Sequence, residues 1–112
     1  MLLILPAASA FANDAYVVNR ASNTVSVFDT RSNQVVGSPI PVGELPEAIA
    51  ITPDGRRAYV TSALGSSISV IDTQANQVVG APIVDTGLPD GIAITPDGKT
   101  AYVTPSSATA SR

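Results

Sequence analysis

The stretch Ile51 to Ala63, "ITPDGRRAYVTSA", returns as "ITPDGKTAYVTPS" from Ile94 to Ser106 in a chain of 112 residues. A shift of 43 residues aligns the two copies without a gap. Between residues 15–57 and 58–100, 23 of the 43 aligned pairs are identical. Such self-similarity at a fixed period indicates one structural unit that is copied along the chain.

Each period contains four short runs rich in Val, Ile, Thr and Ser, which predict β-strands. No apolar stripe at helical spacing is present, so no helix is expected. Gly80 and Pro82 weaken the fourth run, and proline belongs at a sheet edge or a bulge. In the complete period the predicted strands are Ala48–Thr52, Arg57–Ser62, Ser67–Asp72 and Gln77–Val84.

A period in the low forties with four strands is typical of a β-propeller blade. The alternation of Ala48 and Ala50 with Ile49 and Ile51 suits the innermost strand of a wedge that narrows toward the axis. The predicted fold class is therefore all-β, a partial β-propeller forming an arc of about two to two and a half four-stranded antiparallel blades.

Two kinds of turn connect the predicted strands. "TPDG" at Thr52–Gly55 places a proline with fixed φ before Asp and Gly, which predicts a type I turn closed by a glycine bulge. "DTQAN" at Asp72–Asn76 joins strands three and four, where the Asp side chain can bond the backbone that follows it. An Asp–Gly pair also occurs in calcium loops, but too few oxygen ligands accompany these turns.

The composition restricts both chemistry and partners. Charged residues make up 13% of the chain, the net charge is −3, and no run of Lys or Arg exists, so nucleic acid is not an expected partner. The chain has no Cys and no His, which excludes thiol nucleophiles, disulfides and Ser-His-acid triads. We predict no catalytic residue, no metal site and no cofactor.

Residues 1–12, "MLLILPAASAFA", have the pattern of a secretory signal remnant. An apolar segment precedes small-x-small cleavage patterns at Ala8–Ala10 and Ala10–Ala12. No basic residue precedes the apolar segment, and an apolar N-terminal strand is the alternative. No stretch is long enough for a membrane span, and the expected location is secreted, periplasmic or at the cell surface.

Six phrases carry a family resemblance: "AYVVN", "AYVTS", "TVSVFDT", "SISVIDT", "NQVVGSPIPVG" and "AITPDG". Together they resemble the YVTN-type β-propeller repeat from Ala15 to Thr104. The resemblance implies a bacterial or archaeal protein that is secreted, periplasmic or part of a surface layer. It also implies a ring of typically seven blades, similar in fold to lactonase-type and quinoprotein dehydrogenase propellers. In that family, the chain often begins with the second strand of a blade.

The predicted organisation departs from that family in the number of blades. After residues 1–12, propeller repeats occupy 13–104, with repeat 1 at 15–57, repeat 2 at 58–100 and the start of repeat 3 at 101–104, before a polar tail at 105–112. Repeat stacks usually need at least three units. We interpret the chain as a fragment of a larger propeller; the alternative is a head-to-tail oligomer, with self-association through open blade edges.

The two repeats also suggest where a binding site could lie. The identical turns occupy one rim of the ring, and the divergent loops that join strands two to three and four to one occupy the other. Propeller ligands often meet loops of one rim, although exposed loops also drift in sequence without any site. The candidate ligand-binding residues on the divergent rim are Asn19, Arg20, Asn23, Glu44, Glu47, Asp85 and Asp90.

Two functions remain open at this point. The first is a non-catalytic extracytoplasmic module for binding an unknown ligand or protein, or for cell-surface structure. The second is a fragment of a lactonase-like or quinoprotein-dehydrogenase-like propeller enzyme, in which Glu44, Glu47, Asp85 and Asp90 are the carboxylates best placed for chemistry. The tyrosines at 16, 59 and 102 recur at one strand position and are expected to serve packing.

Overall fold

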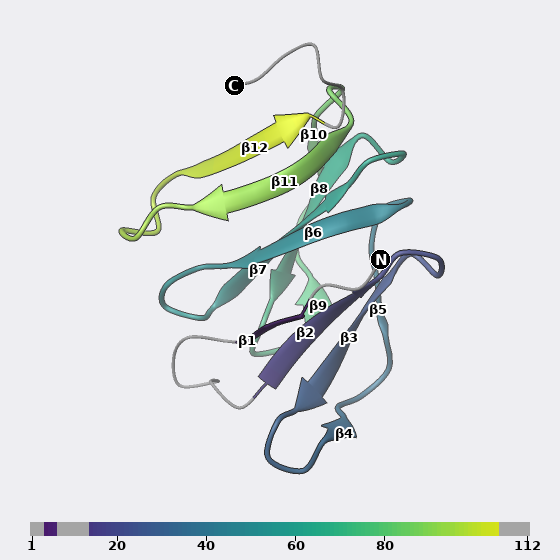
Figure 1. The fold of residues 1–112 in the computed structure, drawn as a ribbon, viewed down its shortest axis with the longest axis vertical. Coiled ribbons are helices and arrows are strands. Elements are labelled where there is room, and N and C mark those ends of the chain that lie inside the picture. Colours follow the sequence, from purple (N-terminus) through teal and green to yellow (C-terminus); the bar gives the residue numbers. More distant parts are fainter. Residues whose placement is uncertain (1–3, 7–13, 106–112) are drawn as a thin grey trace.

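The computed structural model describes residues 4–6 and 14–105, and within them every regular element is a β-strand (Figure 1). No helix there is long and apolar enough to cross a membrane. The strands are β1 (Ile4–Pro6), β2 (Asp14–Asn19), β3 (Thr24–Asp29), β4 (Gln34–Val35), β5 (Ile40–Pro41), β6 (Pro46–Ile51), β7 (Arg57–Ser62), β8 (Ser67–Asp72), β9 (Gln77–Val78), β10 (Ile83–Val84), β11 (Pro89–Ile94) and β12 (Ala101–Pro105).

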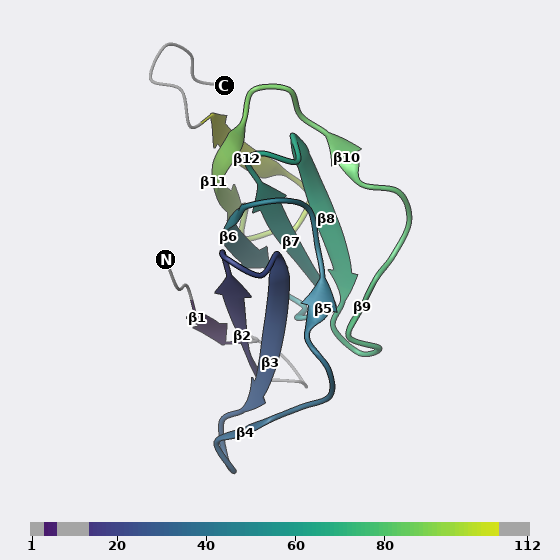
Figure 2. The same ribbon diagram turned by 90° about the vertical axis from the view of Figure 1, so that its right-hand side faces the viewer.

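The strands form three antiparallel sheets that follow one another along the chain (Figures 1 and 2). The first sheet contains β1 to β5, the second contains β6 to β10, and the third contains β11 and β12. We refer to them as blade 1, blade 2 and the half-blade. The predicted fold class is confirmed: the protein is all-β and forms part of a β-propeller.

The second and third strands lie where the sequence places them, whereas the first and fourth differ. The first strand of blade 2 begins at Pro46 rather than Ala48. The fourth is broken into β9 and β10, and both pieces pair with β8. The break falls at Gly80, whose φ is +72°, and at Pro82, which has no N–H to donate. Blade 1 is broken in the same way at Gly37, where φ is +67°.

The turns adopt the predicted chemistry. Gly55 has a φ of +73°, and its N–H donates to the Thr52 carbonyl at 2.8 Å. The Asp72 carboxylate accepts the N–H groups of Gln74 at 2.9 Å and Ala75 at 3.2 Å. These local bonds satisfy backbone donors that the hairpin leaves outside the strand ladder.

The inner strand position of blade 1 is filled by β1. Ile4 pairs with Val17 in β2, as Ile49 of β6 pairs with Val60 in β7. The segment Ile4–Pro6 thus occupies the place of a first strand. The prediction that residues 1–12 are a signal remnant otherwise concerns residues outside the described part of the chain, and it stays a prediction.

The hydrophobic core lies between blade 1 and blade 2. Blade 1 contributes aliphatic side chains from β2, β3 and β5 together with one tyrosine, and blade 2 contributes residues of β6, β7 and β8. A blade therefore buries its faces on its neighbours, as expected for a repeat architecture. The buried members are Tyr16, Val18, Val25, Val27, Ile40, Ile49, Ala58, Val60 and Ile71.

Hydrogen bonding by a tyrosine hydroxyl also joins the two blades. The fully buried Tyr16 hydroxyl donates to the side-chain oxygen of Asn76 at 2.7 Å and lies 3.2 Å from the Thr73 carbonyl oxygen. Burial, followed by the nearby carboxylates of Asp14 and Asp72, raises the pKa of Tyr16 well above its ordinary value. Burial of the hydroxyl favours the neutral phenol over the phenolate.

Candidate functional site

The divergent loops form one continuous rim through backbone hydrogen bonds. The Gly65 N–H donates to the Glu44 carbonyl at 3.0 Å, and the Ala63 N–H donates to the Leu45 carbonyl at 2.9 Å. The loop that follows β7 in blade 2 is therefore joined to the segment that leads from blade 1 into β6. These bonds hold the loops of successive blades in fixed relative positions.

The rim loops differ in sequence but share the same backbone conformation at equivalent positions. Asn23 and Ser66 occupy equivalent positions and have φ values of 59° and 51°, while the equivalent Leu45 and Leu88 have values of 57° and 55°. Leucine rarely adopts a left-handed conformation, so the surrounding structure must enforce it. Divergence of the side chains therefore occurs on a preserved loop framework.

Two of the seven candidate residues use their amide groups to hold the rim. The Asn19 side chain donates to the hydroxyls of Thr24 at 3.2 Å and Ser26 at 2.8 Å. The Asn23 side-chain oxygen accepts the Leu45 N–H at 2.9 Å. Both amides stabilise the loop structure, and a ligand would have to displace these bonds to use them.

Arg20 and Glu47 form an ion pair across the rim. The guanidinium donates from two nitrogens to one Glu47 carboxylate oxygen, at 3.0 and 3.2 Å. Glu47 is the more buried partner, with 13% of its side chain exposed against 42% for Arg20. The pair links the loop after β2 to β6 and presents one cationic edge to solvent.

The three remaining candidates are carboxylates in different settings. Glu44 is exposed, and its backbone carbonyl takes part in the rim. The Asp85 carboxylate accepts the Gly87 N–H at 2.9 Å within its own loop. Asp90 is half-buried at the start of β11, and its backbone carbonyl accepts the Thr61 hydroxyl at 2.6 Å. The assignment of these residues to a binding site stays a prediction.

A buried serine at this rim was not predicted from the sequence. Ser62 ends β7 and is fully buried, and its hydroxyl has no hydrogen-bond partner among the described residues. A Cβ on Gly43 would approach the Ser62 Cβ and hydroxyl to 2.7 Å, so the rim closes tightly over this serine. The repeat alignment marks this position, because the blade 1 equivalent of Ser62 is Asn19. The Asn19 amide bonds two hydroxyls, so both repeats carry a polar side chain at this point of the rim.

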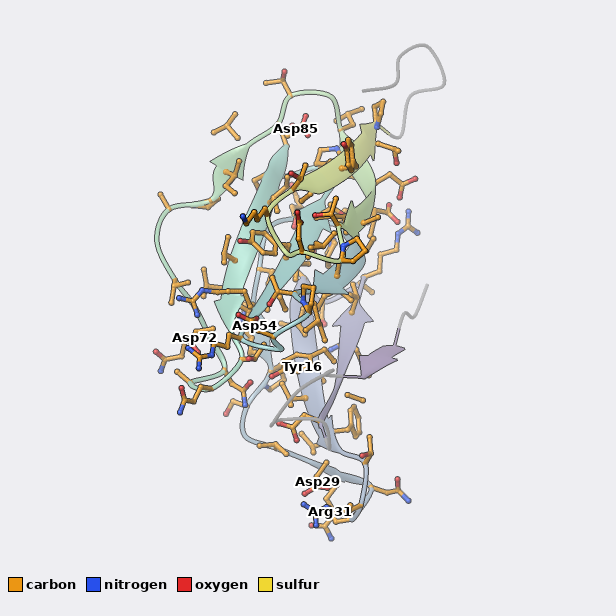
Figure 3. All side chains as sticks on the ribbon, turned by 90° about the vertical axis from the view of Figure 1, so that its left-hand side faces the viewer. Tyr16, Asp29, Arg31, Asp54, Asp72 and Asp85 are labelled. Atoms are coloured by element: carbon orange, nitrogen blue, oxygen red, sulfur yellow. The ribbon has the colours of Figure 1, made fainter. Side chains whose placement is uncertain are left out.

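Acidic side chains of the identical turns lie on the opposite rim. A hydrogen bond from the Thr52 hydroxyl, followed by one from the Arg56 N–H, lowers the pKa of Asp54. The equivalent bonds from the Thr95 hydroxyl and the Lys99 N–H lower the pKa of Asp97. Figure 3 shows Asp54 and Asp72 near one another, while Asp85 lies at the other end of the molecule from Asp29. In the described part of the chain, no three acidic, His or Cys side chains are grouped to hold a metal ion.

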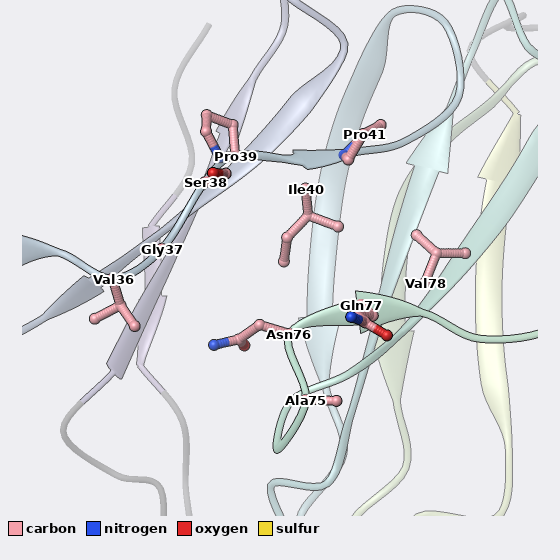
Figure 4. A pocket seen from close by; sticks show the side chains of 10 residues that line it. All are labelled: Val36, Gly37, Ser38, Pro39, Ile40, Pro41, Ala75, Asn76, Gln77 and Val78. Atoms are coloured by element: carbon pink, nitrogen blue, oxygen red, sulfur yellow. The ribbon is translucent and has the colours of Figure 1, made fainter.

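The hollows of the molecule lie between or beside blades. A cleft of about 580 Å³ separates the stretch Val36–Pro41 of blade 1 from Ala75–Val78 of blade 2, and Ile40 points into it (Figure 4). A second hollow of about 560 Å³ opens on the outer face of blade 1. It is mainly apolar and is lined by Ala15, Val17, Asn19, Ser26, Phe28, Thr30 and Asn33.

No family model and no curated protein matches this chain. Among solved structures, it is similar to hydrazine synthase from Kuenenia stuttgartiensis, with 38% identity and a TM-score of 0.79 over 91% of this chain. It is similar to a functionally unknown protein from Desulfotomaculum acetoxidans, with 26% identity and a TM-score of 0.79 over 91%. Dihydro-heme d1 dehydrogenase NirN aligns with 92% of the chain at 20% identity and a TM-score of 0.74.

These likenesses agree with the partial propeller seen in the sheets. The chain spans 28% of the hydrazine synthase chain, 34% of the Desulfotomaculum chain and 23% of the NirN chain. The similarity therefore covers a section of each larger molecule.

Proposed function

We propose that this chain is a section of an extracytoplasmic β-propeller of the YVTN type, and that it serves as a non-catalytic module for binding or for cell-surface structure. The observation that carries the proposal is that most candidate side chains on the rim bond other groups of the rim. Asn19, Asn23 and Asp85 bond groups of their own rim, and Arg20 pairs with Glu47. Side chains engaged in this way stabilise a fixed surface.

The binding surface of this module is the divergent rim. Its backbone is held by bonds between loops of successive blades, so a ligand would meet a pre-formed surface at low entropic cost. The exposed Glu44 and the exposed edge of Arg20 supply charges of both signs within this surface. Such a surface suits a polar ligand or a protein partner.

A propeller enzyme fragment is the second candidate function. One structural neighbour, hydrazine synthase, has the name of an enzyme, although this chain spans 28% of that chain. Glu44 and Asp90 are the candidate carboxylates that no described hydrogen bond engages, so they are the side chains most open to chemistry. A lactonase-like site would place such carboxylates around a metal ion.

A metal titration and a lactone hydrolysis assay test the choice between these functions. The wild type is compared with a Glu44→Ala/Asp90→Ala double variant and with Asp97→Ala, a control on the opposite rim. For a non-catalytic module we expect equal calorimetric traces with Ca²⁺ and no lactone turnover in all three proteins. Turnover or metal binding that disappears only in the double variant would overturn the proposal in favour of the enzyme.

Export is tested separately, because the location depends on residues 1–12. The full chain, and the same chain without these residues, are fused to alkaline phosphatase, which is active only outside the cytoplasm. We expect phosphatase activity in intact bacterial cells from the full chain alone. Equal activity from the two fusions would remove the role of residues 1–12 as a signal.

A further inference from the structure

The ion pair between Arg20 and Glu47 joins two successive blades. Arg20 lies in the loop that follows β2 of blade 1, and Glu47 lies in β6 of blade 2. Two guanidinium nitrogens donate to one Glu47 carboxylate oxygen. The cation therefore comes from the preceding blade, and the anion comes from the first strand of the blade that follows.

The repeat places a second carboxylate at the position of Glu47. Asp90 lies 43 residues further along the chain, in β11 of the half-blade. β11 packs on β7 as β6 packs on β2. In each strand the pairing is irregular at the acid, directly after Pro46 in β6 and after Pro89 in β11. Such a bulge re-aims the side chain that it carries, so the two carboxylates leave the backbone at equivalent points.

Equivalent threonines hold the two bulges. In blade 2 the Thr61 hydroxyl accepts the Ala48 N–H at 3.1 Å. In the half-blade the Thr104 hydroxyl accepts the Gly91 N–H at 3.1 Å. Thr61 also donates its hydroxyl proton to the Asp90 carbonyl at 2.6 Å, which fixes the backbone of Asp90 against blade 2. A carboxylate on a backbone held in this way binds a ligand at low entropic cost.

The position of Arg20 carries no cation in blade 2. Its counterpart is Ala63, in the loop after β7. The two loops share a left-handed residue, with a φ of 59° at Asn23 and 51° at Ser66. Asp90 is half-buried, and among residues 4–6 and 14–105 its carboxylate has no hydrogen-bond or ion-pair partner. The repeat therefore keeps the acid of the pair without its guanidinium.

The place of the missing guanidinium is defined within this chain. We call it the Asp90 slot, the space beside Ala63 and Asp90 that corresponds to the place of Arg20 beside Glu47. Glu47 has the half-blade as its following neighbour, and it is nevertheless paired from the preceding blade. The two parts that form the Asp90 slot, the loop after β7 and the start of β11, are both described.

We propose that the Asp90 slot binds a guanidinium group supplied from outside the chain, as on an arginine side chain of a peptide partner. The guanidinium lies beside Asp90 as that of Arg20 lies beside Glu47. Its planar set of N–H donors suits a carboxylate better than a lysine ammonium does. The inference rests on the proposed function, because it names the class of ligand that the divergent rim binds.

A nitrogen-15 chemical-shift titration with N-acetyl-arginine amide tests the slot. We expect saturable shifts at the amides of Ala63 and Asp90 with this probe. N-acetyl-citrulline amide, which has nearly the same shape and no charge, should cause none. Asp90→Asn should lose the saturable shifts, whereas Asp97→Asn, the control on the opposite rim of the same half-blade, should keep them.

Removal of the built-in guanidinium gives the matched positive control. Arg20→Ala vacates the equivalent place beside Glu47, so the probe should then bind at two places. The double variant Arg20→Ala/Asp90→Asn should bind it beside Glu47 alone. A wild type without saturable shifts, shifts that persist in Asp90→Asn, or equal shifts with the citrulline probe would overturn the inference.

The two proposals fail through different results. Absence of arginine binding together with absence of lactone turnover overturns the Asp90 slot and leaves the non-catalytic module in place. Lactone turnover that disappears in Glu44→Ala/Asp90→Ala, without arginine binding to the wild type, overturns both. The titration of the wild type and the hydrolysis assay therefore separate the ligand class from the choice between module and enzyme.

Discussion

One residue type shows how tertiary context changes the role of a repeated side chain. Tyr16, Tyr59 and Tyr102 share one strand position. Tyr16 is fully buried and bonded to blade 2, Tyr59 is half-buried, and Tyr102 is largely exposed. The side chain is the same in all three repeats, and its contribution to stability depends on the blade that follows.

Replacement of Tyr16 by Phe is expected to lower the free energy of unfolding by about 1–2 kcal/mol, because the buried Thr73 carbonyl and the half-buried Asn76 side chain lose their donor. Tyr59→Phe, at the equivalent position in blade 2, should change it by less than about 0.5 kcal/mol. Urea titrations followed by circular dichroism measure both values. Equal losses in the two variants would contradict the role assigned to the inter-blade bond.

The same tyrosine makes stability depend on alkaline pH. Burial raises the pKa of Tyr16 in the folded state, so its stabilisation is fully present below the unfolded pKa of about 10 and is lost as pH rises toward the folded value. We expect the midpoint of urea unfolding to fall above about pH 10 in the wild type. Tyr16→Phe should show a smaller fall over the same range, and parallel curves would argue against this origin.

At the scale of elements, equivalent turns share a conformation but differ in their tertiary contacts. Asn33 and Asn76 end matching turns with φ values of 56° and 55°. Only Asn76 accepts the Tyr16 hydroxyl. A glycine would relieve the left-handed conformation at either position.

This difference yields a paired prediction. Asn33→Gly should leave the free energy of unfolding unchanged or slightly raised, because glycine adopts a positive φ without strain. Asn76→Gly should be about 1 kcal/mol less stable than Asn33→Gly, because Tyr16 loses its acceptor. Thermal unfolding of both variants gives the comparison. A more stable Asn76→Gly would be inconsistent with it.

Most elements could be predicted from their sequence because their signals are local. Alternating apolar residues and the turns at Thr52–Gly55 and Asp72–Asn76 specify strands two and three. The fourth strand was harder, since its break depends on a glycine with positive φ followed by a proline. The pairing of β1 with β2 could not be read from periodicity, because residues 1–12 do not match the repeat.

For the whole molecule, a core shared between blades implies cooperative unfolding. Val25 of blade 1 and Ile71 of blade 2 belong to one buried cluster. Their mutual burial means that neither blade can lose its structure without exposing the apolar face of the other.

Val25→Ala and Ile71→Ala should therefore shift one common transition. The expected losses are about 1.5–3 kcal/mol for Val25→Ala and about 2–5 kcal/mol for Ile71→Ala. Val84→Ala, on the exposed outer edge, is the control and should cost less than about 0.5 kcal/mol. Hydrogen exchange that protects one blade while the other is open would contradict the shared core.

The candidate site illustrates the limit of the repeat comparison. Sequence divergence correctly separated the loops of Asn19–Asn23 and Glu44–Glu47 from the repeated turns. It could not reveal that Asn19 and Asn23 bond their own rim, or that Arg20 pairs with Glu47. The Asn23 and Arg20 contacts join residues 22 and 27 positions apart, and no local signal marks their partners. Asn19 bonds hydroxyls only 5 and 7 residues away, but which hydroxyls it reaches depends on the pairing of β2 with β3.

The sequence by itself determined the repeat, the strand order and the turns, because propensity, periodicity and turn chemistry act over a few neighbouring residues. Only the tertiary structure decided which copy of each repeated residue is buried, bonded or exposed. The physical reason is that a blade presents the same side chains in every repeat, while burial and hydrogen bonding require a neighbouring blade. Blade 1 and blade 2 supply that neighbour to one another, and the hydrogen bond from the Tyr16 hydroxyl to Asn76 is one result.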